Sequence, residues 1–328
     1  MRAMRRLIWV VLALSGLYAG YWALGAKALR GGAEAALVEV RRAGWGDAGG
    51  LSLAGFPSRF DLTLDAPRVT DPAGAFEWRA PVAQILALSY QPNRVIFWAP
   101  PEQELRLGGQ AFTLTNTDMR ASVEVGLNEA APLSEATLVI ETPALAGAQG
   151  ALRAEARQLR GAIALAPAQP ETPDAPAYRI GLELLDATSP ALDDPIAQLT
   201  LDAVVSLTAP LDRHLAETQT PPRPEHLSLR RLYLDWAGKR LLVQGELTPD
   251  AAGYPQGKLV LESAEWRDWI ATAEAQGLVP AKNKAMLLAA AESLARQSPD
   301  GVLRLPLAFR SGGIFFGPLA LGPAPRLW

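Results

Sequence analysis

The stretch GLSLAGFPSRFDLTLDAPRV, residues Gly50 to Val69, decides the fold class because it holds two amphipathic strand patterns that are out of phase. Leu51 and Leu53 occupy odd positions in its first half, whereas Phe60 and Leu62 occupy even positions in its second half. Side chains alternate between the two faces of a strand, so one regular strand would leave one of these sets in water. The chain must therefore change direction between the two halves.

Gly55, Phe56 and Pro57 stand where the phase changes. Glycine adopts backbone angles that other residues avoid, and proline cannot donate a hydrogen bond to a neighbouring strand. We therefore expect a bulge, a corner or a strand break from Gly55 to Ser58. The Phe56 side chain is expected to pack into the core beneath this kink.

The alternation of apolar and polar residues recurs along most of the chain after Gly50. Segments of strand length include AQILALSY, QAFTLTN, YRIGLELLDA, IAQLTLDAVVSLTAP and KRLLVQGELTP, and short breaks with Gly, Pro or Asn separate many of them. Such breaks favour antiparallel hairpins, because parallel strands need intervening helices. The sequence predicts a mainly β fold with minor α content, in which a large curved antiparallel sheet has an apolar face that must be covered.

Two amphipathic helices in the C-terminal region are expected to cover part of that face. Within residues 263–277, the apolar residues recur at the spacing of one helix face: Trp266, Trp269, Ile270 and Ala273. Within residues 281–297, one face carries Leu287, Ala291, Leu294 and Ala295. We favour packing against the sheet over a role at a membrane surface or a partner. A hairpin that turns at Ser311 to Gly313 is expected to finish the sheet.

Residues 1–30 have the composition of a cytoplasmic tip followed by a transmembrane signal anchor. The uncharged run Leu7 to Leu24 has 18 residues, close to the roughly 20 that a helix needs to cross hydrocarbon. The predicted anchor residues are Leu7, Trp9, Leu12, Leu14, Leu17, Tyr18, Tyr21 and Trp22. By the positive-inside rule, a cytoplasmic N-terminus is marked by Arg2, Arg5 and Arg6.

A cleaved signal peptide is the alternative, because Leu24, Gly25 and Ala26 loosely resemble a small-residue cleavage site. We favour an uncleaved anchor, since the apolar run is longer than a typical signal core. Residues 31–328 then form a β-rich domain outside the cytoplasm. Its first part, residues 35–40, fits either a helix or the approach to a strand. The proline-rich segment at 166–177 is either a subdivision of this domain or a long surface loop.

The net charge and the lack of catalytic or metal-binding motifs restrict the classes of function that we expect. Residues 31–328 hold 26 basic and 34 acidic side chains, a formal net charge of −8, which disfavours nucleic acid and anionic headgroups as partners. The chain has no cysteine, and His214 and His226 lack the spacing of a metal site, so we interpret both as solvated loop residues. Asp61 and Asp65 fit the polar face of a strand. We expect no catalytic residue, no metal, no cofactor and no enzymatic activity.

The pair Phe97 and Trp98 is the candidate for an apolar ligand groove, because exposed apolar patches mark interaction sites. The other interpretation makes one of them a core residue and the other an incidental surface residue, since neighbours on a strand face opposite ways.

Three stretches carry a family resemblance: GFPSRFDLTLDAPRV, WRAPVAQILALSYQPNRVIF and LPLAFRSGGIFFGPLALGPAPRL. Together they resemble the bacterial envelope family known as domain of unknown function 2125, over almost the whole chain. The first stretch is also similar, more distantly, to the beginning of AsmA-like envelope proteins, which have long β-sheet grooves implicated in lipid handling. Taken with the expected anchor, the resemblance to a bacterial envelope family implies the bacterial inner membrane, with the main domain in the periplasm.

Two functions follow as hypotheses. One is a β-sheet groove that binds or passes a lipid or another hydrophobic ligand. The alternative is a scaffold or assembly factor that holds other envelope proteins, without enzymatic activity.

Overall fold

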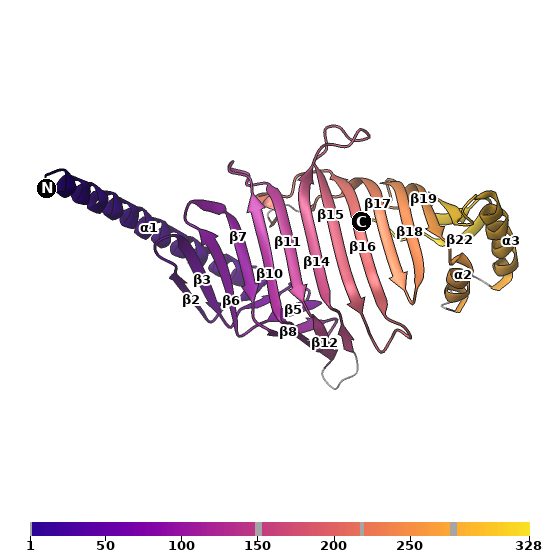
Figure 1. Ribbon diagram of the computed structural model, residues 1–328, viewed down its shortest axis with the longest axis horizontal. Helices are drawn as coiled ribbons and strands as arrows, with labels where there is room; N and C mark the ends of the chain where they lie inside the picture. The colour runs from indigo at the N-terminus through magenta and orange to yellow at the C-terminus, as the bar shows by residue number, and fades with distance from the viewer. Residues whose placement is uncertain (1, 148–152, 217–219, 276–280) are drawn as a thin grey trace. The chain divides into compact units, whose positions relative to one another are not determined.

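The computed structural model describes residues 2–147, 153–216, 220–275 and 281–328. Two compact units make up the chain: Met1–Glu124 with Val139–Arg153, and Val125–Leu138 with Ala154–Trp328. Both consist mainly of antiparallel strands, which confirms the predicted fold class (Figure 1). Three strands, β10 (Asp118–Val125), β11 (Leu133–Glu141) and β13 (Arg153–Glu155), have residues in both units.

The first unit begins with α1 (Arg2–Arg42), a single helix of 41 residues. At 1.5 Å per residue this helix is about 60 Å long. The segment 35–40, which the sequence left open between helix and strand, is helical. The side chains of Arg2, Arg5, Arg6 and Leu7 lie outside the described part of the structure, so their predicted roles stay predictions.

The strands of the first unit form two layers. One layer has the order β2 (Gly50–Ala54), β3 (Arg59–Asp65), β6 (Val82–Leu88), β7 (Gln91–Ala99), β10 (Asp118–Val125). The other has the order β1 (Gly46–Asp47), β4 (Arg68–Thr70), β5 (Phe76–Arg79), β8 (Glu102–Leu107), β9 (Gln110–Thr115), β12 (Ala144–Gly147). The Trp78 ring of β5 packs edge-on against Phe97 of β7, with 5.9 Å between centroids, so the layers share a core.

The phase change in residues 50–69 is the turn of a hairpin. β2 and β3 pair antiparallel with Leu53 opposite Leu62, which brings the two out-of-phase sets onto one face. Gly55 has a φ of +105°, and a Cβ atom there would lie 2.7 Å from the carbonyl oxygen of Arg59. Only glycine fits this turn without strain.

The expectation that Phe56 fills the core is wrong. Its side chain is 58% exposed, because the turn carries it beyond the end of the paired strands. It packs edge-on against Trp22 of α1 instead, with 5.3 Å between ring centroids.

The second unit is built on one antiparallel run of strands. Their order is β14 (Gln158–Ala166), β15 (Ala177–Ala187), β16 (Ile196–Leu207), β17 (Pro224–Trp236), β18 (Lys239–Pro249), β19 (Pro255–Ser263), β20 (Leu303–Arg310), β21 (Gly313–Phe316), β22 (Leu319–Pro323). The proline-rich residues 167–176 connect β14 to β15, which pair with each other. A short 3-10 helix, Arg213–Ala216, lies in the connection from β16 to β17.

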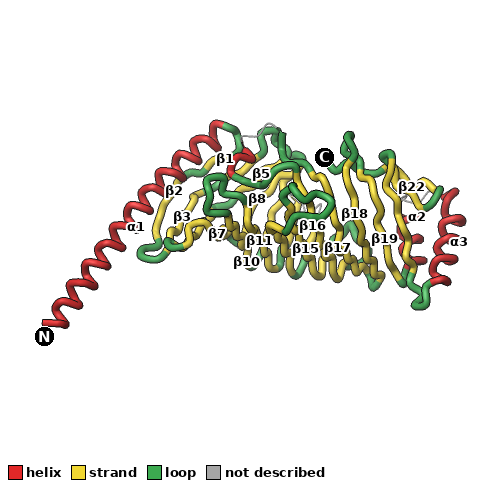
Figure 2. The backbone as a smooth tube through the Cα atoms, turned by 90° about the horizontal axis from the view of Figure 1, so that it is seen from above, coloured by secondary structure: helices red, strands yellow, loops and turns green. Residues whose placement is uncertain are grey.

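Two helices, α2 (Trp266–Ala275) and α3 (Ala281–Gln297), follow β19 and pack against β20. Figure 2 shows both as red helices beside β22. A hydrophobic cluster joins the helices to the strand through Trp266, Ala291, Ala295, Leu303 and Leu305. The predicted cover is therefore confirmed, and it lies over the last strands of the sheet.

Replacing Gly55 with alanine should destabilise the first unit by about 1–3 kcal/mol, because a Cβ atom would clash with the Arg59 carbonyl in a left-handed backbone. Thermal unfolding of the full chain in detergent micelles, followed by circular dichroism, measures this. Gly161→Ala is the control, since a Cβ atom there would meet only the Leu138 Cβ at 4.0 Å. Equal melting temperatures for the two variants would contradict the steric account.

Candidate functional site

The first candidate site is the junction between α1 and the hairpin turns of the first unit. The Tyr18 hydroxyl donates to the carbonyl oxygen of Pro57 at 3.0 Å and lies 2.9 Å from the Ser89 hydroxyl. One turn further on, the Tyr21 hydroxyl donates to the carbonyl oxygen of Ser89 at 2.9 Å. These bonds tie the helix to the turn between β2 and β3 and to the turn between β6 and β7.

Trp22 completes this aromatic junction, which we define as Tyr18, Tyr21 and Trp22 with their partners. The indole nitrogen of Trp22 donates to the carbonyl oxygen of Arg59 at 2.8 Å. Its ring also stacks on Phe60 at 5.8 Å. Gly25, one turn later, brings the helix close to the sheet, because a Cβ atom there would lie 3.0 Å from the Phe60 ring.

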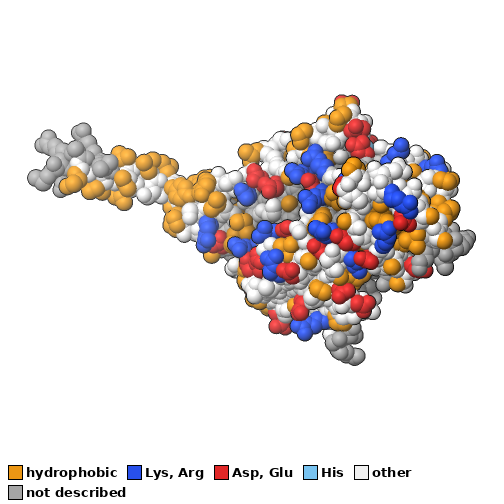
Figure 3. All heavy atoms as spheres, turned by 45° about the vertical axis from the view of Figure 1, so that its right-hand side comes forward, with side chains coloured by type: hydrophobic (Ala, Val, Ile, Leu, Met, Phe, Trp, Pro, Cys, Tyr) orange, Lys and Arg blue, Asp and Glu red, His pale blue; other side chains and the backbone are white. Residues whose placement is uncertain are grey.

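The remaining anchor residues lie on the free part of α1. The side chains of Trp9, Leu12, Leu14 and Leu17 are exposed, and Figure 3 shows hydrophobic side chains along this part of the helix. Ile8–Arg42 is long and apolar enough to cross a membrane, with a mean hydropathy of 1.5 in its best window. By length and composition, α1 is thus compatible with a membrane span or a signal anchor.

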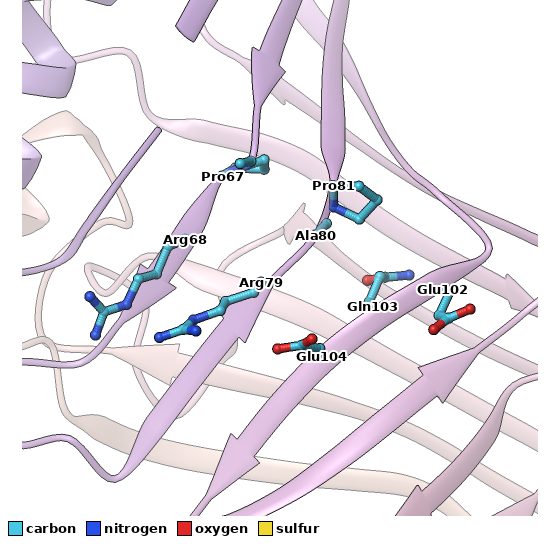
Figure 4. Close-up of a pocket in the computed structure, with 9 residues that line it drawn as sticks. Pro67, Arg68, Arg79, Ala80, Pro81, Glu102, Gln103 and Glu104 are labelled. Atoms are coloured by element: carbon cyan, nitrogen blue, oxygen red, sulfur yellow. The ribbon is translucent and has the colours of Figure 1, made fainter. Parts of the chain in front are cut away.

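A second candidate is a hollow of about 620 Å³ in the first unit, shown in Figure 4. Its lining consists of Ala66, Pro67, Arg68, Arg79, Ala80, Pro81, Glu102, Gln103 and Glu104. Gln103 is 1% exposed and fully engaged: its side chain donates to the carbonyl oxygen of Pro100 at 3.0 Å and accepts from the Trp78 indole at 2.7 Å.

The two arginines that line this hollow form ion pairs with Glu77. Glu77 accepts from both Arg68, at 2.9 Å, and Arg79. Burial raises the pKa of the Glu77 carboxyl, but the hydrogen bond from Arg79 and the charges of both arginines lower it further, so its pKa lies below the usual range. The arginines thus already hold a carboxylate, and Glu104 lies opposite Arg79 in the β5–β8 pairing. This pattern is typical of a structural ion-pair ladder.

The residues proposed for an apolar groove, Phe97 and Trp98, lie on β7 of the first unit. Phe97 faces the other layer and contacts Trp78. Trp98 points to the opposite side of the strand, where its neighbours are Gln84 and Arg120. Both side chains are half-buried, and the structure does not bring them together on one surface.

The third candidate is the apolar face of the second unit, which sequence reasoning expected but did not locate. The strand register aligns one residue from each strand, β15 to β20, in a single row across the sheet. These residues are Leu182, Leu201, Leu232, Val243, Leu261 and Leu305. A neighbouring row runs through Leu184, Leu199, Leu234 and Leu241. We call these two rows the leucine face.

Cover over the leucine face is uneven. Leu305, at the end where α2 and α3 pack, is buried. Leu182, Leu201 and Leu232, nearer the middle of the sheet, are only half-buried. Leucine side chains in a closed core are usually fully buried, so this part of the face is incompletely covered by the described residues.

The opposite face of the same strands is polar. Arg179 donates to both carboxylate oxygens of Asp202 at 2.8 Å. The hydrogen bond from Arg179 and its charge hold the pKa of the Asp202 carboxyl below its usual range. The sheet of the second unit is therefore amphipathic, with leucines on one side and paired charges on the other.

The described residues contain no group of three or more His, Asp or Glu side chains arranged to hold a metal ion. His214 is exposed, as expected of a loop residue. The same interpretation is wrong for His226, which is 2% exposed, because it belongs to β17 and pairs with Ser206 of β16. Asp61 forms an ion pair with Arg59 at 3.0 Å, and Asp65 ends β3.

This fold and these surfaces define a β-rich protein preceded by one apolar helix. The chain belongs to the family described as an uncharacterized protein conserved in bacteria (DUF2125), whose model matches residues 22–325. No curated protein and no solved structure matches the chain. The more distant similarity to AsmA-like proteins is not shown by these comparisons.

Replacing Trp22 with phenylalanine should loosen the aromatic junction, because the Arg59 carbonyl loses its donor. A lost hydrogen bond of this kind costs about 0.5–1.5 kcal/mol. Hydrogen exchange of the turn residues 55–59, measured by mass spectrometry, should then become several-fold faster. Trp9→Phe is the matched control, since Trp9 lies on α1 and is 72% exposed. An unchanged exchange rate in Trp22→Phe would refute the junction as a structural contact.

Replacing Asp202 with asparagine should lower the melting temperature at pH 7 by at most about 2 °C, since the ion pair with Arg179 is partly exposed. The carboxyl pKa is lowered in the folded state, so the stabilisation is present above the unfolded pKa of about 3.9 and is lost as the pH falls through the lower folded value. The difference between wild type and variant should therefore shrink between pH 7 and pH 2. A difference that grows on acidification would contradict this sign.

Proposed function

We propose that this protein is a membrane-anchored envelope protein that binds or passes a lipid or another hydrophobic ligand along the leucine face, without catalysing a reaction. In this proposal α1 anchors the chain in the bacterial inner membrane, with the N-terminus in the cytoplasm and both β units in the periplasm. The apolar run of α1 supports the anchor, and the family, which is described as conserved in bacteria, supports the bacterial setting.

One observation carries the ligand proposal. The row from Leu182 to Leu305 crosses six strands, which at a strand spacing of about 4.8 Å makes a track about 24 Å long. The half-buried part of the row, Leu182, Leu201 and Leu232, offers apolar contact without an interrupting charge, whereas Val243 and Leu305 are buried within the protein. A stretch of an acyl chain lying across β15, β16 and β17 fits this accessible part.

Charge supports the same choice of ligand. Residues 31–328 carry a formal net charge of −8, and acidic surfaces repel polyanions. The leucine face contributes no charged group, so recognition there depends on apolar area, which is worth roughly 25 cal/mol per Å² buried. Selection by headgroup is not expected from this face.

Site-specific photo-crosslinking tests the proposal in the full chain, expressed in bacteria. A benzoylphenylalanine at Leu201 should capture lipid from the envelope, which mass spectrometry of the purified protein identifies. The same group at Thr200 is the matched control, because this neighbour on β16 points to the opposite face of the sheet.

Lipid adducts at position 201 and not at position 200 would support the proposal. Equal labelling, or no lipid at position 201, would rule out a lipid track on this face. Protein adducts at position 201 would favour the scaffold function instead, because they would show that a partner protein covers the leucines.

A further inference from the structure

The aromatic junction lies inside the uncharged stretch of α1 and not at its C-terminal end. The uncharged run that starts at Leu7 continues past Leu24 through Gly25 and Ala26, and the next residue is Lys27. These 20 residues equal the roughly 20 that hydrocarbon requires, so a helix that enters the membrane at Leu7 leaves it near Lys27. Tyr18 precedes Lys27 by nine residues, about 13 Å along the helix axis.

The portion of α1 that precedes the junction is too short to span a bilayer. Leu7 to Leu17 is 11 residues, or about 16 Å, whereas the hydrocarbon core is about 30 Å thick. The hairpin turns that Tyr18 and Tyr21 hold therefore lie beside the part of the helix that has to be inside the membrane.

We propose that the β2–β3 turn, residues 55–58, and the β6–β7 turn at Ser89 and Tyr90 insert into the outer leaflet of the membrane that α1 crosses. The occupant of this surface is the interfacial and upper acyl region of the phospholipids. The inference rests on α1 as the membrane span and is independent of the leucine face.

The exposed side chains of the two turns suit this environment. Phe56 is 58% exposed and Tyr90 is 72% exposed, and Pro57 lies beside Phe56. The turns carry the usual turn residues Gly55, Pro57, Ser58 and Ser89, and Phe56 and Tyr90 are exposed aromatic side chains added to them. Aromatic side chains are enriched at the interface between membrane and water.

The backbone of the turns is also prepared for a medium with little water. An unpaired carbonyl costs several kcal/mol in hydrocarbon, so irregular backbone at membrane depth must find protein partners. The carbonyls of Pro57, Arg59 and Ser89 find theirs in Tyr18, Trp22 and Tyr21 of α1. The aromatic residues of the helix thus supply donors where the membrane supplies none.

The nearest charge is neutralised within the protein. Arg59 follows the β2–β3 turn and forms an ion pair with Asp61 at 3.0 Å. On α1, the next ion pair is Arg30 with Glu34 at 2.9 Å, three residues beyond Lys27 and on the water side of the proposed boundary. The charge that lies at the depth of Trp22 is therefore paired within the protein, as charges inside a membrane usually are, and the Arg30–Glu34 pair lies beyond the boundary.

Depth-dependent fluorescence quenching tests the insertion. The chain has no cysteine, so single cysteines can be placed freely and labelled with the environment-sensitive dye NBD. The full chain is reconstituted into vesicles of phosphatidylethanolamine and phosphatidylglycerol (3:1) that contain lipids with a doxyl quencher at carbon 5. The test variants are Phe56→Cys and Tyr90→Cys; the latter side chain is largely exposed, so its loss disturbs little packing.

Two controls frame the result. Leu14→Cys on the exposed part of α1 reports whether the helix is inserted, and Ala73→Cys reports a turn of the same unit between β4 and β5. We expect quenching of at least about threefold at positions 14, 56 and 90 and little at position 73.

Quenching at position 14 with water-like signals at 56 and 90 would overturn the insertion of the turns while leaving the span intact. A water-like signal at position 14 would overturn the inference at its base, because α1 would not be in the membrane. Neither result depends on the lipid crosslinking at position 201.

Discussion

The hydrogen bonds from Tyr18, Tyr21 and Trp22 to three turn carbonyls fix α1 to the first β unit. Bonds of this type contribute about 0.5–1.5 kcal/mol each, and the ring contacts with Phe56 and Phe60 add to them. Together these contacts contribute a free energy several times RT, so they hold the helix in one orientation relative to the first β unit. If α1 anchors the chain as proposed, these contacts set the orientation of the first unit at the membrane surface, because a flexible linker would leave it free to tumble.

The fold class was predictable because it depends on a simple period. Alternation along residues 51–64 and the phase change at Gly55 indicate two strands and a break, and the hairpin provides both. The two late helices were predictable for the same reason, since their apolar faces recur at helical spacing. Phe56 was misjudged because a residue in a turn belongs to neither strand pattern.

The sites were less predictable, because they depend on register and on long-range contacts. The aromatic end of the apolar run fits an interfacial anchor, and nothing local shows that Tyr18 bonds to residues 57 and 89. Likewise each leucine of Leu182, Leu201 and Leu232 is visible in its own strand, but only the pairing of β15, β16 and β17 aligns them into a row. His226 was assigned to the loop beside it, whereas β17 begins two residues earlier, at Pro224.

The two units meet the same physical requirement in different ways. Each has an apolar sheet face that must leave water. In the first unit a second sheet provides the cover. Defined contacts fill the space between the two layers: Trp78 contacts Phe97, and the fully buried Gln103 has its hydrogen bonds satisfied. Such a core is stabilised by its own packing and has no need of a ligand.

In the second unit, two helices cover only the last strands of the face. The half-buried leucines of β15, β16 and β17 keep apolar area in contact with solvent, which costs stability in the absence of a ligand. Exposed apolar patches on folded domains usually mark sites that a hydrophobic molecule or a partner surface covers. The proposed ligand binding therefore concerns the second unit, and the proposed bilayer contact concerns the first.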